Sequence, residues 1–232
     1  AAIVEKDPAG LGGTCLRRGC IPAKTWLETA HRIEQMQDAS DYGIDGVDPK
    51  GLRANLEAIV KRKNRIVLKN GKGIEFLMKK NKVSVIWGTA EIDAPGKVTV
   101  KPSKTEAPKG ALGPGAYQAK HIIIATGARP RALPGLEPDR KLIWTYFEAM
   151  VPEAMPKSLL VVGSGAIGIE FASFYRTLGA DVTVVEILPQ ILPVEDAEIA
   201  AFARKQFEKQ GIKIMTGAKV TKLDKQANGV TA

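Results

Sequence analysis

Two cysteines five residues apart, Cys15 and Cys20, are the side chains best suited to redox chemistry. On an ideal α-helix, residues at this spacing have Cα atoms about 8 to 9 Å apart, whereas a disulfide needs about 4.4 to 6.8 Å. A bridge therefore requires a distorted turn, which Gly19 and Pro22 favour because they disrupt regular helix. Such a bridge would be labile and redox-active, and Lys24 would favour its thiolate form. The alternative is a pair of buried thiols with no redox role.

A glycine-rich loop is the second group of residues that predicts chemistry. Gly163, Gly165 and Gly168 follow an apolar, strand-like segment at 158–162 and precede a helical pattern. In this context the spacing indicates a dinucleotide site. The first glycine allows a tight turn, the second lets the backbone approach a pyrophosphate, and the third lets helix and strand pack closely. The N–H groups at the helix N-terminus would bind the phosphates.

An acidic residue follows at the position that selects the nucleotide. Glu186 ends the next predicted strand, 18 residues beyond Gly168. A carboxylate there binds the ribose 2′-hydroxyl of NAD and repels the 2′-phosphate of NADP. Because no arginine occurs in residues 187–192, we expect NAD. The alternative is a glycine turn with an unrelated surface glutamate.

The hydrophobic pattern predicts the elements that position these groups. In the first part of the chain we expect strands at 2–5, 83–87, 97–101 and 117–125, and helices at 14–37 and in the stretch up to about residue 80. After a proline-rich linker at 129–138, strands and helices alternate: a capping box at 145–148, strands at 158–162, 181–185 and 212–215, and helices at 166–178 and 197–210. This order predicts an α/β fold with a parallel, doubly wound sheet and two domains, 1–144 and 145–232.

Composition excludes several classes of protein. Among 232 residues, 44% are hydrophobic and 25% charged, so a folded core is expected rather than disorder. No apolar run is long enough to cross a bilayer, and no leader-like segment opens the chain. Two cysteines cannot build a disulfide framework, and neither His31 nor His121 has zinc-finger spacing, so we expect no metal site and a cytoplasmic protein.

The net charge of +9 is concentrated in one segment. Residues 61–82 carry nine lysines and arginines against a single acid, Glu75. No aromatic platform accompanies them, and apolar residues recur at helical spacing, so nucleic-acid binding is not expected. The segment is either a solvated helix face or a surface for an acidic partner.

A pattern that occurs twice in the chain predicts that further sequence precedes residue 1. The segment ending in Glu5 repeats the pattern that ends in Glu186, but no glycine loop comes before it. By analogy, about 20 to 30 residues would stand upstream. The chain also ends inside an apparent strand pair, so we expect a fragment truncated at both ends.

Three motifs together resemble a known family. The motif Gly12-Gly-Thr-Cys15-Leu-x-x-Gly-Cys20-Ile-Pro-x-Lys24 is similar to the redox-active disulfide segment of the class I flavoprotein disulfide reductases. Ala125-Thr-Gly127 and Gly163 to Glu170 match two further family motifs, in family order. Within the family, Ile21-Pro22, Glu186 and the segment 188–192 most resemble the dihydrolipoamide dehydrogenase branch, whereas the NADP-dependent glutathione reductases would carry arginines after the strand.

The resemblance implies FAD and NAD as cofactors and an incomplete Rossmann-like domain for each. It implies that Cys20 faces the flavin and Cys15 exchanges with substrate. FAD would be bound by Glu5, Gly13, Thr14, Lys24, Ala90, Thr126, Gly127 and Ala128. NAD would be bound by Gly163, Gly165, Ala166, Ile167, Gly168, Glu170, Glu186 and Val220.

The implied activity passes electrons from dihydrolipoamide, carried by the lipoyl domain of a 2-oxo acid dehydrogenase complex, through the disulfide and FAD to NAD+. The intact protein would be a homodimer, and this chain alone would be inactive. Two alternatives stay open: another flavin disulfide reductase such as mercuric reductase, or a non-catalytic NAD-binding module. Arg17 and Arg18 depart from the Asn-Val common in the family and add charge beside the cysteines.

Overall fold

The computed structural model describes all 232 residues and divides into two compact units. The first comprises residues 1–21 and 64–129, and the second comprises residues 22–63 and 130–232. The boundary between residues 129 and 130 falls at the start of the linker predicted at 129–138. The units differ from the predicted division at residue 144, because residues from 22–63 pack into the core formed by the later part of the chain.

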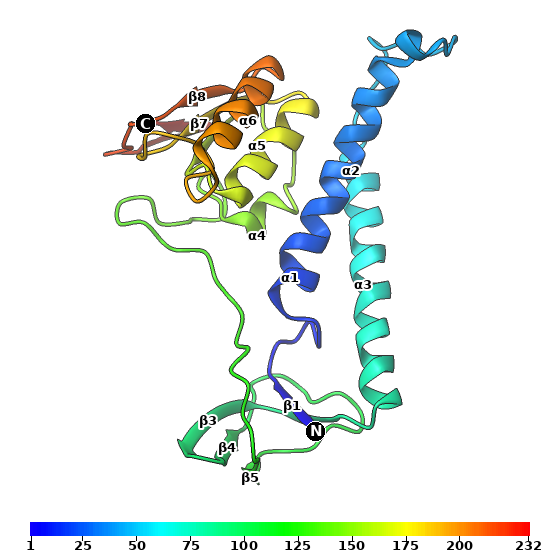
Figure 1. Ribbon diagram of the computed structural model, residues 1–232, viewed down its shortest axis with the longest axis vertical. Helices are drawn as coiled ribbons and strands as arrows, with labels where there is room; N and C mark the ends of the chain where they lie inside the picture. The colour runs from blue at the N-terminus through cyan, green and yellow to red at the C-terminus, as the bar shows by residue number, and fades with distance from the viewer. The chain divides into compact units, whose positions relative to one another are not determined.

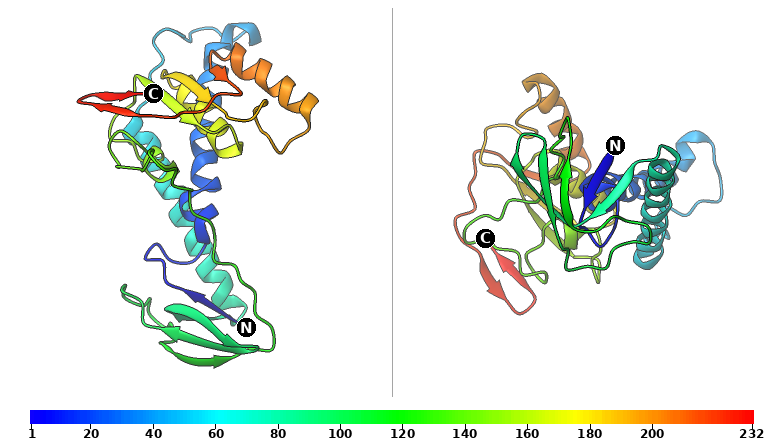
Figure 2. Two further views of the ribbon diagram at one scale, coloured as in Figure 1. Left: turned by 90° about the vertical axis from the view of Figure 1, so that its left-hand side faces the viewer. Right: turned by 90° about the horizontal axis from the view of Figure 1, so that it is seen from below.

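The first unit contains two small sheets. Strand β1 (Ala2–Glu5) pairs in parallel with β2 (Ser84–Trp87), so that Glu5 lies opposite Trp87. Strands β3 (Thr89–Ala94), β4 (Lys97–Lys101) and β5 (Gly115–Gln118) form one antiparallel sheet, drawn in green in Figure 2. The short helix α1 (Gly13–Arg18) follows β1, and most of α3 (Leu56–Lys80) precedes β2.

The predicted strand at 117–125 is wrong over most of its length. Strand β5 ends at Gln118, and residues 119–125 form no ladder. The apolar run there has strand-like composition, but a strand also needs a neighbouring strand to receive its backbone hydrogen bonds. Ile123 and Ile124 are accordingly 89% and 73% exposed.

The second unit contains the predicted β-α-β arrangement. Strands β6 (Ser158–Val162), β7 (Asp181–Val185) and β8 (Lys213–Met215) form a parallel sheet in that order. Helix α5 (Ala166–Thr177) joins the first two strands, and α6 (Ala197–Lys209) joins the second and third (Figure 1). The predicted α/β class with parallel pairing is confirmed.

Shorter elements complete the second unit. They are η1 (Ala39–Tyr42), α4 (Tyr146–Ala149) and the hairpin of β9 (Asp224–Gln226) and β10 (Gly229–Thr231). The capping box predicted at 145–148 is present: Thr145 accepts from the N–H of Phe147, and Glu148 accepts from the N–H of Thr145. No helix in the chain combines the length and the apolar character needed to cross a membrane.

The core of the second unit explains why the early helices belong to it. Trp26 of α2 (Cys20–Gln37) is fully buried and stacks on Phe174 of α5, with ring centroids 5.3 Å apart. Tyr175 lies beside it and donates its hydroxyl to the carbonyl of Ala149 at 2.7 Å. Burial raises the pKa of the Tyr175 hydroxyl well above its ordinary value, so the group stays a neutral donor. Stacked aromatic rings of this size supply much of a core's apolar burial.

Candidate functional site

The two cysteines lie on either side of a break between helices. Cys15 lies within α1, and Cys20 is the first residue of α2, so the single helix predicted over 14–37 is interrupted at Gly19. A Cβ atom at Gly19 would lie 3.0 Å from the carbonyl oxygen of Thr14 and 3.2 Å from the Cα of Cys15. The predicted irregular turn is therefore confirmed, and it needs glycine for lack of space.

Both cysteines are exposed, and no disulfide joins them in the structure. The alternative prediction, that both thiols are buried, is therefore wrong. An accessible thiol pair can exchange with a disulfide or dithiol that arrives from solvent. The geometry suits redox exchange better than a role in packing.

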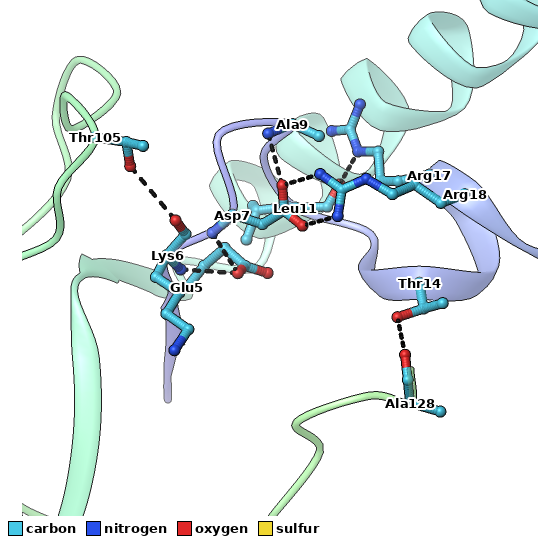
Figure 3. Close-up of polar contacts among 10 residues, drawn as sticks. All are labelled: Glu5, Lys6, Asp7, Ala9, Leu11, Thr14, Arg17, Arg18, Thr105 and Ala128. Carbon is cyan, nitrogen blue, oxygen red and sulfur yellow. Dashed lines mark hydrogen bonds and ion pairs between the residues drawn. The ribbon is translucent and has the colours of Figure 1, made fainter. Parts of the chain in front are cut away.

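The segment before Cys15 contacts a segment more than a hundred residues later. Thr14 donates its hydroxyl to the carbonyl of Ala128 at 3.2 Å (Figure 3). A Cβ atom at Gly127 would lie 3.0 Å from the same hydroxyl oxygen, so glycine there permits the approach. Thr14, Gly127 and Ala128, which the resemblance assigned to one cofactor, therefore lie together. Thr126 directly precedes Gly127 in the chain.

Glu5 lies at the end of β1, where its Oε1 accepts the N–H groups of Lys6 and Asp7 at 2.7 and 2.9 Å (Figure 3). Its Oε2 takes part in no hydrogen bond with the protein. The carbonyl of Glu5 accepts the N–H of Gly88 at 2.9 Å, and this bond ties the residues leading to Ala90 to the end of β1. Glu5, at the end of β1, and Ala90, near the start of β3, thus lie on segments joined by this bond in the first unit.

Lys24 lies in the second unit, where its ammonium group forms an ion pair with the Glu170 carboxylate. Lys24 comes from α2 and Glu170 from α5, and their side chains are 60% and 29% exposed. The resemblance assigned Lys24 to FAD and Glu170 to NAD. The structure therefore joins two residues predicted to serve different cofactors.

The glycine-rich loop has the predicted strand–turn–helix geometry. Gly163 has a φ of 98°, which favours glycine, and its N–H donates to the carbonyl of Val185 at the end of β7 at 2.8 Å. A Cβ atom at Gly168 would overlap the carbonyl oxygen of Gly163 and lie 3.3 Å from Val161 of β6. Gly168 therefore allows close packing of helix and strand, as predicted.

The start of α5 is open to a ligand. Gly165 is its N-cap residue, and no side chain caps the first N–H groups of the helix. Gly165, Ala166 and Ile167 are all exposed. Helix N-termini of this kind bind phosphate groups because unpaired N–H donors and the helix dipole act together.

Glu186 is 94% buried, since 6% of its surface is exposed, and it is held by three hydrogen bonds. Its Oε2 accepts the N–H and the hydroxyl of Ser164 at 2.8 and 2.7 Å, and its Oε1 accepts the N–H of Leu188 at 2.9 Å. Burial alone would raise the pKa of Glu186, but the hydrogen bonds from Leu188 and Ser164 outweigh it and lower the pKa. The carboxylate is therefore ionised beside the glycine-rich loop.

Val220 lies on a segment that is tied to the same glutamate. The carbonyl of Glu186 accepts the N–H of Ala218 at 2.9 Å, two residues before Val220. Leu188 accepts the N–H of Gly217 at 2.9 Å. Residues 163–168 and 186 thus gather at the carboxyl ends of β6 and β7, and the chain leading to Val220 is held at the same edge by the bond from Ala218.

Sequence reasoning missed Ser164. Its backbone carbonyl accepts the N–H of Leu192 at 2.9 Å, and its side chain is fully buried against Glu186. The available signal was a hydroxyl residue inside the glycine motif, 22 residues before the acid. Asp7, which pairs with Arg18, was also missed.

Comparison with known proteins agrees with this geometry. Residues 2–232 match the family described as pyridine nucleotide-disulphide oxidoreductase. The dihydrolipoyl dehydrogenase of Rhizobium etli is 55% identical, and that of Zymomonas mobilis 46% identical, over the whole chain. These alignments cover 49% and 47% of the relatives, so the chain spans about half the length of the curated relatives it matches.

Solved structures give the same result. LpdA from Mycobacterium tuberculosis matches 99% of the chain with a TM-score of 0.83 and 27% identity, over 48% of its own length. The HOCl-induced flavoprotein disulfide reductase RclA from Escherichia coli matches with a TM-score of 0.75 and 26% identity, over 99% of this chain and 46% of its own. The match over residues 2–232 shows that the chain belongs to the pyridine nucleotide-disulphide oxidoreductase family.

Proposed function

We propose that the intact protein is an FAD- and NAD-dependent oxidoreductase that oxidises dihydrolipoamide, and that this chain supplies its dithiol and nucleotide-binding regions. The observation that carries the proposal is the exposed pair Cys15 and Cys20 on either side of the helix break at Gly19. The dihydrolipoyl dehydrogenases among its relatives support the choice of substrate.

The residues present fit both cofactors. Glu5 keeps one carboxylate oxygen available for the adenosine ribose of FAD, and space is open around Gly13, where a Cβ atom would meet nothing within 4 Å. The open N-terminus of α5 suits the pyrophosphate of NAD. The ionised Glu186 carboxylate next to that loop supplies the acceptor chemistry that a ribose hydroxyl needs.

The proposed assignments follow the two halves of the sequence. Residues 1–144 would bind FAD, through Glu5, Gly13, Thr14, Lys24, Ala90, Thr126, Gly127 and Ala128. Residues 145–232 would bind NAD, through Gly163, Gly165, Ala166, Ile167, Gly168, Glu170, Glu186 and Val220. The intact protein would be a cytoplasmic homodimer that receives its substrate from the lipoyl domain of a 2-oxo acid dehydrogenase complex.

The protein's own step is thiol–disulfide exchange. A thiolate of the substrate attacks Cys15 of the Cys15–Cys20 disulfide, and Cys20 leaves as a thiolate. The second substrate thiol then displaces Cys15, so the substrate is oxidised to its cyclic disulfide while the two cysteines are reduced. FAD, held by the residues named above, would supply the acceptor for the two electrons of the cysteines, and NAD+ would be their final acceptor.

The test uses the intact protein loaded with FAD. Thiol counting should find Cys15 and Cys20 bridged after oxidation, and two-electron reduction should produce a thiolate-to-flavin charge-transfer absorbance. Cys20→Ser should abolish that absorbance, whereas Cys15→Ser should keep it, since Cys20 is the sulfur assigned to the flavin side.

Three results would contradict the proposal. Two unbridged cysteines in the oxidised protein would exclude the redox pair. Persistence of the absorbance in Cys20→Ser would reverse the roles of the two sulfurs. Absence of stoichiometric FAD from the intact protein would favour a non-catalytic NAD-binding module.

A further inference from the structure

The two arginines between the cysteines each have a specific anchor. Arg18 forms a two-point contact with Asp7, in the loop after β1: Nη2 donates to Oδ1 at 2.6 Å, and Nη1 donates to Oδ2 (Figure 3). Asp7 Oδ1 also accepts the N–H of Ala9 at 2.9 Å. Burial opposes ionisation of Asp7, but these hydrogen bonds and the charges of Arg18 and Arg17 lower its pKa.

Arg17 is anchored on another side of α1. Only 8% of its side chain is exposed, and its Nε donates to the carbonyl of Leu11 at 2.7 Å (Figure 3). Its guanidinium lies over Gly71 of α3, where a Cβ atom would come within 2.6 Å of Cζ and Nη2. Glu75, one turn further along α3, approaches the guanidinium at 4.0 Å.

Helix α1 needs such anchors because, apart from the hydrogen bond from Thr14 to Ala128, few contacts hold it. It has six residues, none of which is buried, and no side chain caps its N-terminus. Isolated helices shorter than about 12 residues are marginal in water, since nucleation costs more than a few hydrogen bonds return. The helix also ends at Gly19, so the helical ladder of α2 does not extend into it.

We propose that Arg17 and Arg18 are positioning residues for the thiol pair: through Leu11, Gly71 and Asp7 they fix α1, and with it Cys15, relative to Cys20. The inference rests on the proposed redox function of the two cysteines. A fixed Cys15 presents its sulfur to Cys20 at a high effective concentration, which favours the disulfide. Loss of an anchor frees the segment and favours the two thiols.

The rival explanation is that the arginines act as cations on the thiolates. The two explanations predict opposite shifts of the disulfide–thiol equilibrium for Arg18→Gln. If charge dominates, Arg18→Gln removes a cation and disfavours the thiolate form, whereas Asp7→Asn exposes the cation and favours it. If positioning dominates, both substitutions release α1 and favour the thiols.

The experiment measures the disulfide equilibrium in the intact, FAD-loaded protein under anaerobic glutathione buffers. The reaction is one protein disulfide plus two glutathione thiols giving two protein thiols plus one glutathione disulfide, trapped by alkylation and read by mass spectrometry. For Arg18→Gln, Asp7→Asn and Arg17→Gln we expect the equilibrium constant to shift about tenfold toward the thiols, equivalent to about 30 mV for this two-electron couple. The double variant of Asp7 and Arg18 should match either single variant, because both remove the same contact.

Two further variants sharpen the result. Arg18→Lys keeps the charge but loses the two-point geometry, so it should shift toward the thiols if positioning dominates and stay unchanged if charge dominates. It also keeps the test valid if Arg18→Gln fails to fold. Lys101→Gln breaks an exposed ion pair with Glu91 in the same unit and should change nothing.

The outcomes separate the two proposals. Opposite shifts for Arg18→Gln and Asp7→Asn, or no shift in either, would overturn the positioning role while leaving the redox pair intact. A wild-type protein that forms no Cys15–Cys20 disulfide in any buffer would overturn the proposed function, and the inference with it.

Discussion

Ser164 and Glu186, 22 residues apart, are joined by two hydrogen bonds to one carboxylate oxygen. The backbone N–H and the hydroxyl of Ser164 both donate to Oε2, at 2.8 and 2.7 Å. The glycine-rich loop after β6 is thereby fastened to the residue that follows β7. The glutamate therefore holds the loop in shape, in addition to the ribose-binding role proposed for it.

Ser164→Ala should destabilise the protein and weaken NAD binding. The lost hydroxyl donates to an ionised carboxylate, and such a bond contributes about 1.5 to 3 kcal/mol. Urea unfolding should show a fall of that size in the free energy of unfolding. Ser173→Ala is the matched control, because the Ser173 hydroxyl donates at 3.2 Å to the neutral amide of Gln210 and its loss should cost only about 0.5 to 1.5 kcal/mol. Equal decreases in the free energy of unfolding for Ser164→Ala and Ser173→Ala would show that the hydrogen bond to Glu186 contributes no more than one to a neutral amide.

Glu186→Gln should reduce the preference for NAD over NADP. The amide keeps the shape of the side chain but loses the charge that repels a 2′-phosphate, and it must turn an N–H₂ group toward Ser164 or Leu188. Loss of a charged hydrogen bond of about 1.5 to 3 kcal/mol corresponds to about a ten- to hundredfold change in relative affinity. Calorimetric titration of both nucleotides into the intact protein measures it. An unchanged ratio would place the selectivity elsewhere.

Glu186 also predicts a pH dependence of stability. Because the native pKa lies below the unfolded value of about 4.3, the unfolded state binds more protons between the two values. The stabilisation is thus complete at neutral pH and is lost as the pH falls below about 4.3 through the native pKa. Acid unfolding curves of wild type and Glu186→Gln should converge as the pH falls through this range.

The sequence predicted the second unit well because its signals are local. Residues 158–185 combine a β-branched strand, a glycine turn and an amphipathic helix, and each of these signals is contained in a few neighbouring residues. The same is true of the capping box at Thr145 and Glu148, whose signal lies within four residues. These elements have the predicted bounds to within a residue or two.

The errors arose where the outcome depends on distant residues. The apolar run at 122–124 is strand-like in composition, yet whether it pairs depends on a neighbouring strand that the run itself cannot specify. The ion pair between Lys24 and Glu170 spans 146 residues and left no trace in either local pattern. The irregular turn at Gly19 was predicted, but the single helix predicted over 14–37 did not include the break, because helical periodicity resumes one residue later.

Gly71→Ala should destabilise the protein although it improves helix propensity. Alanine in a helix interior gains about 1 kcal/mol over glycine. At Gly71, however, the new Cβ atom would occupy the place of the Arg17 guanidinium and displace it from the Leu11 carbonyl. A hydrogen bond made by a charged, buried donor contributes about 1.5 to 3 kcal/mol, so the net change should be a loss of about 0.5 to 2 kcal/mol.

Gly73→Ala provides the comparison. Gly73 lies two residues further along α3, is exposed, and has no atom within 4 Å of the position of a Cβ. Alanine there should stabilise the protein by about 0.5 to 1 kcal/mol. Urea unfolding should show a lower free energy of unfolding for Gly71→Ala and a higher one for Gly73→Ala. If both substitutions stabilise the protein, the Arg17 guanidinium moves away from Gly71 without loss of stability.

Lys63→Met should stabilise the protein. The Lys63 side chain is buried, and its ammonium group has one hydrogen bond, to the carbonyl of Met150 at 3.4 Å. Burial lowers the pKa of Lys63, which shows that the charged form is disfavoured in the folded state. Replacement of buried charges by apolar residues of similar volume often gains about 1 to 4 kcal/mol, and loss of a donor to the Met150 carbonyl offsets about 1 kcal/mol of that. We expect a net gain of up to about 3 kcal/mol at pH 7, measured by urea unfolding.

The pH dependence of the same variant tests the cause. Between its lowered native pKa and the unfolded value of about 10.4, Lys63 binds more protons in the unfolded state, so the wild-type free energy of unfolding should rise with pH across that window. Lys63→Met should remove this rise, and its advantage over wild type should shrink as the pH approaches 10. Lys61→Met, at an exposed position one half-turn earlier in α3, should change the stability by no more than about 0.5 kcal/mol at any pH. If Lys63→Met lowers the stability at pH 7, the bond to Met150 outweighs the cost of burying the charge.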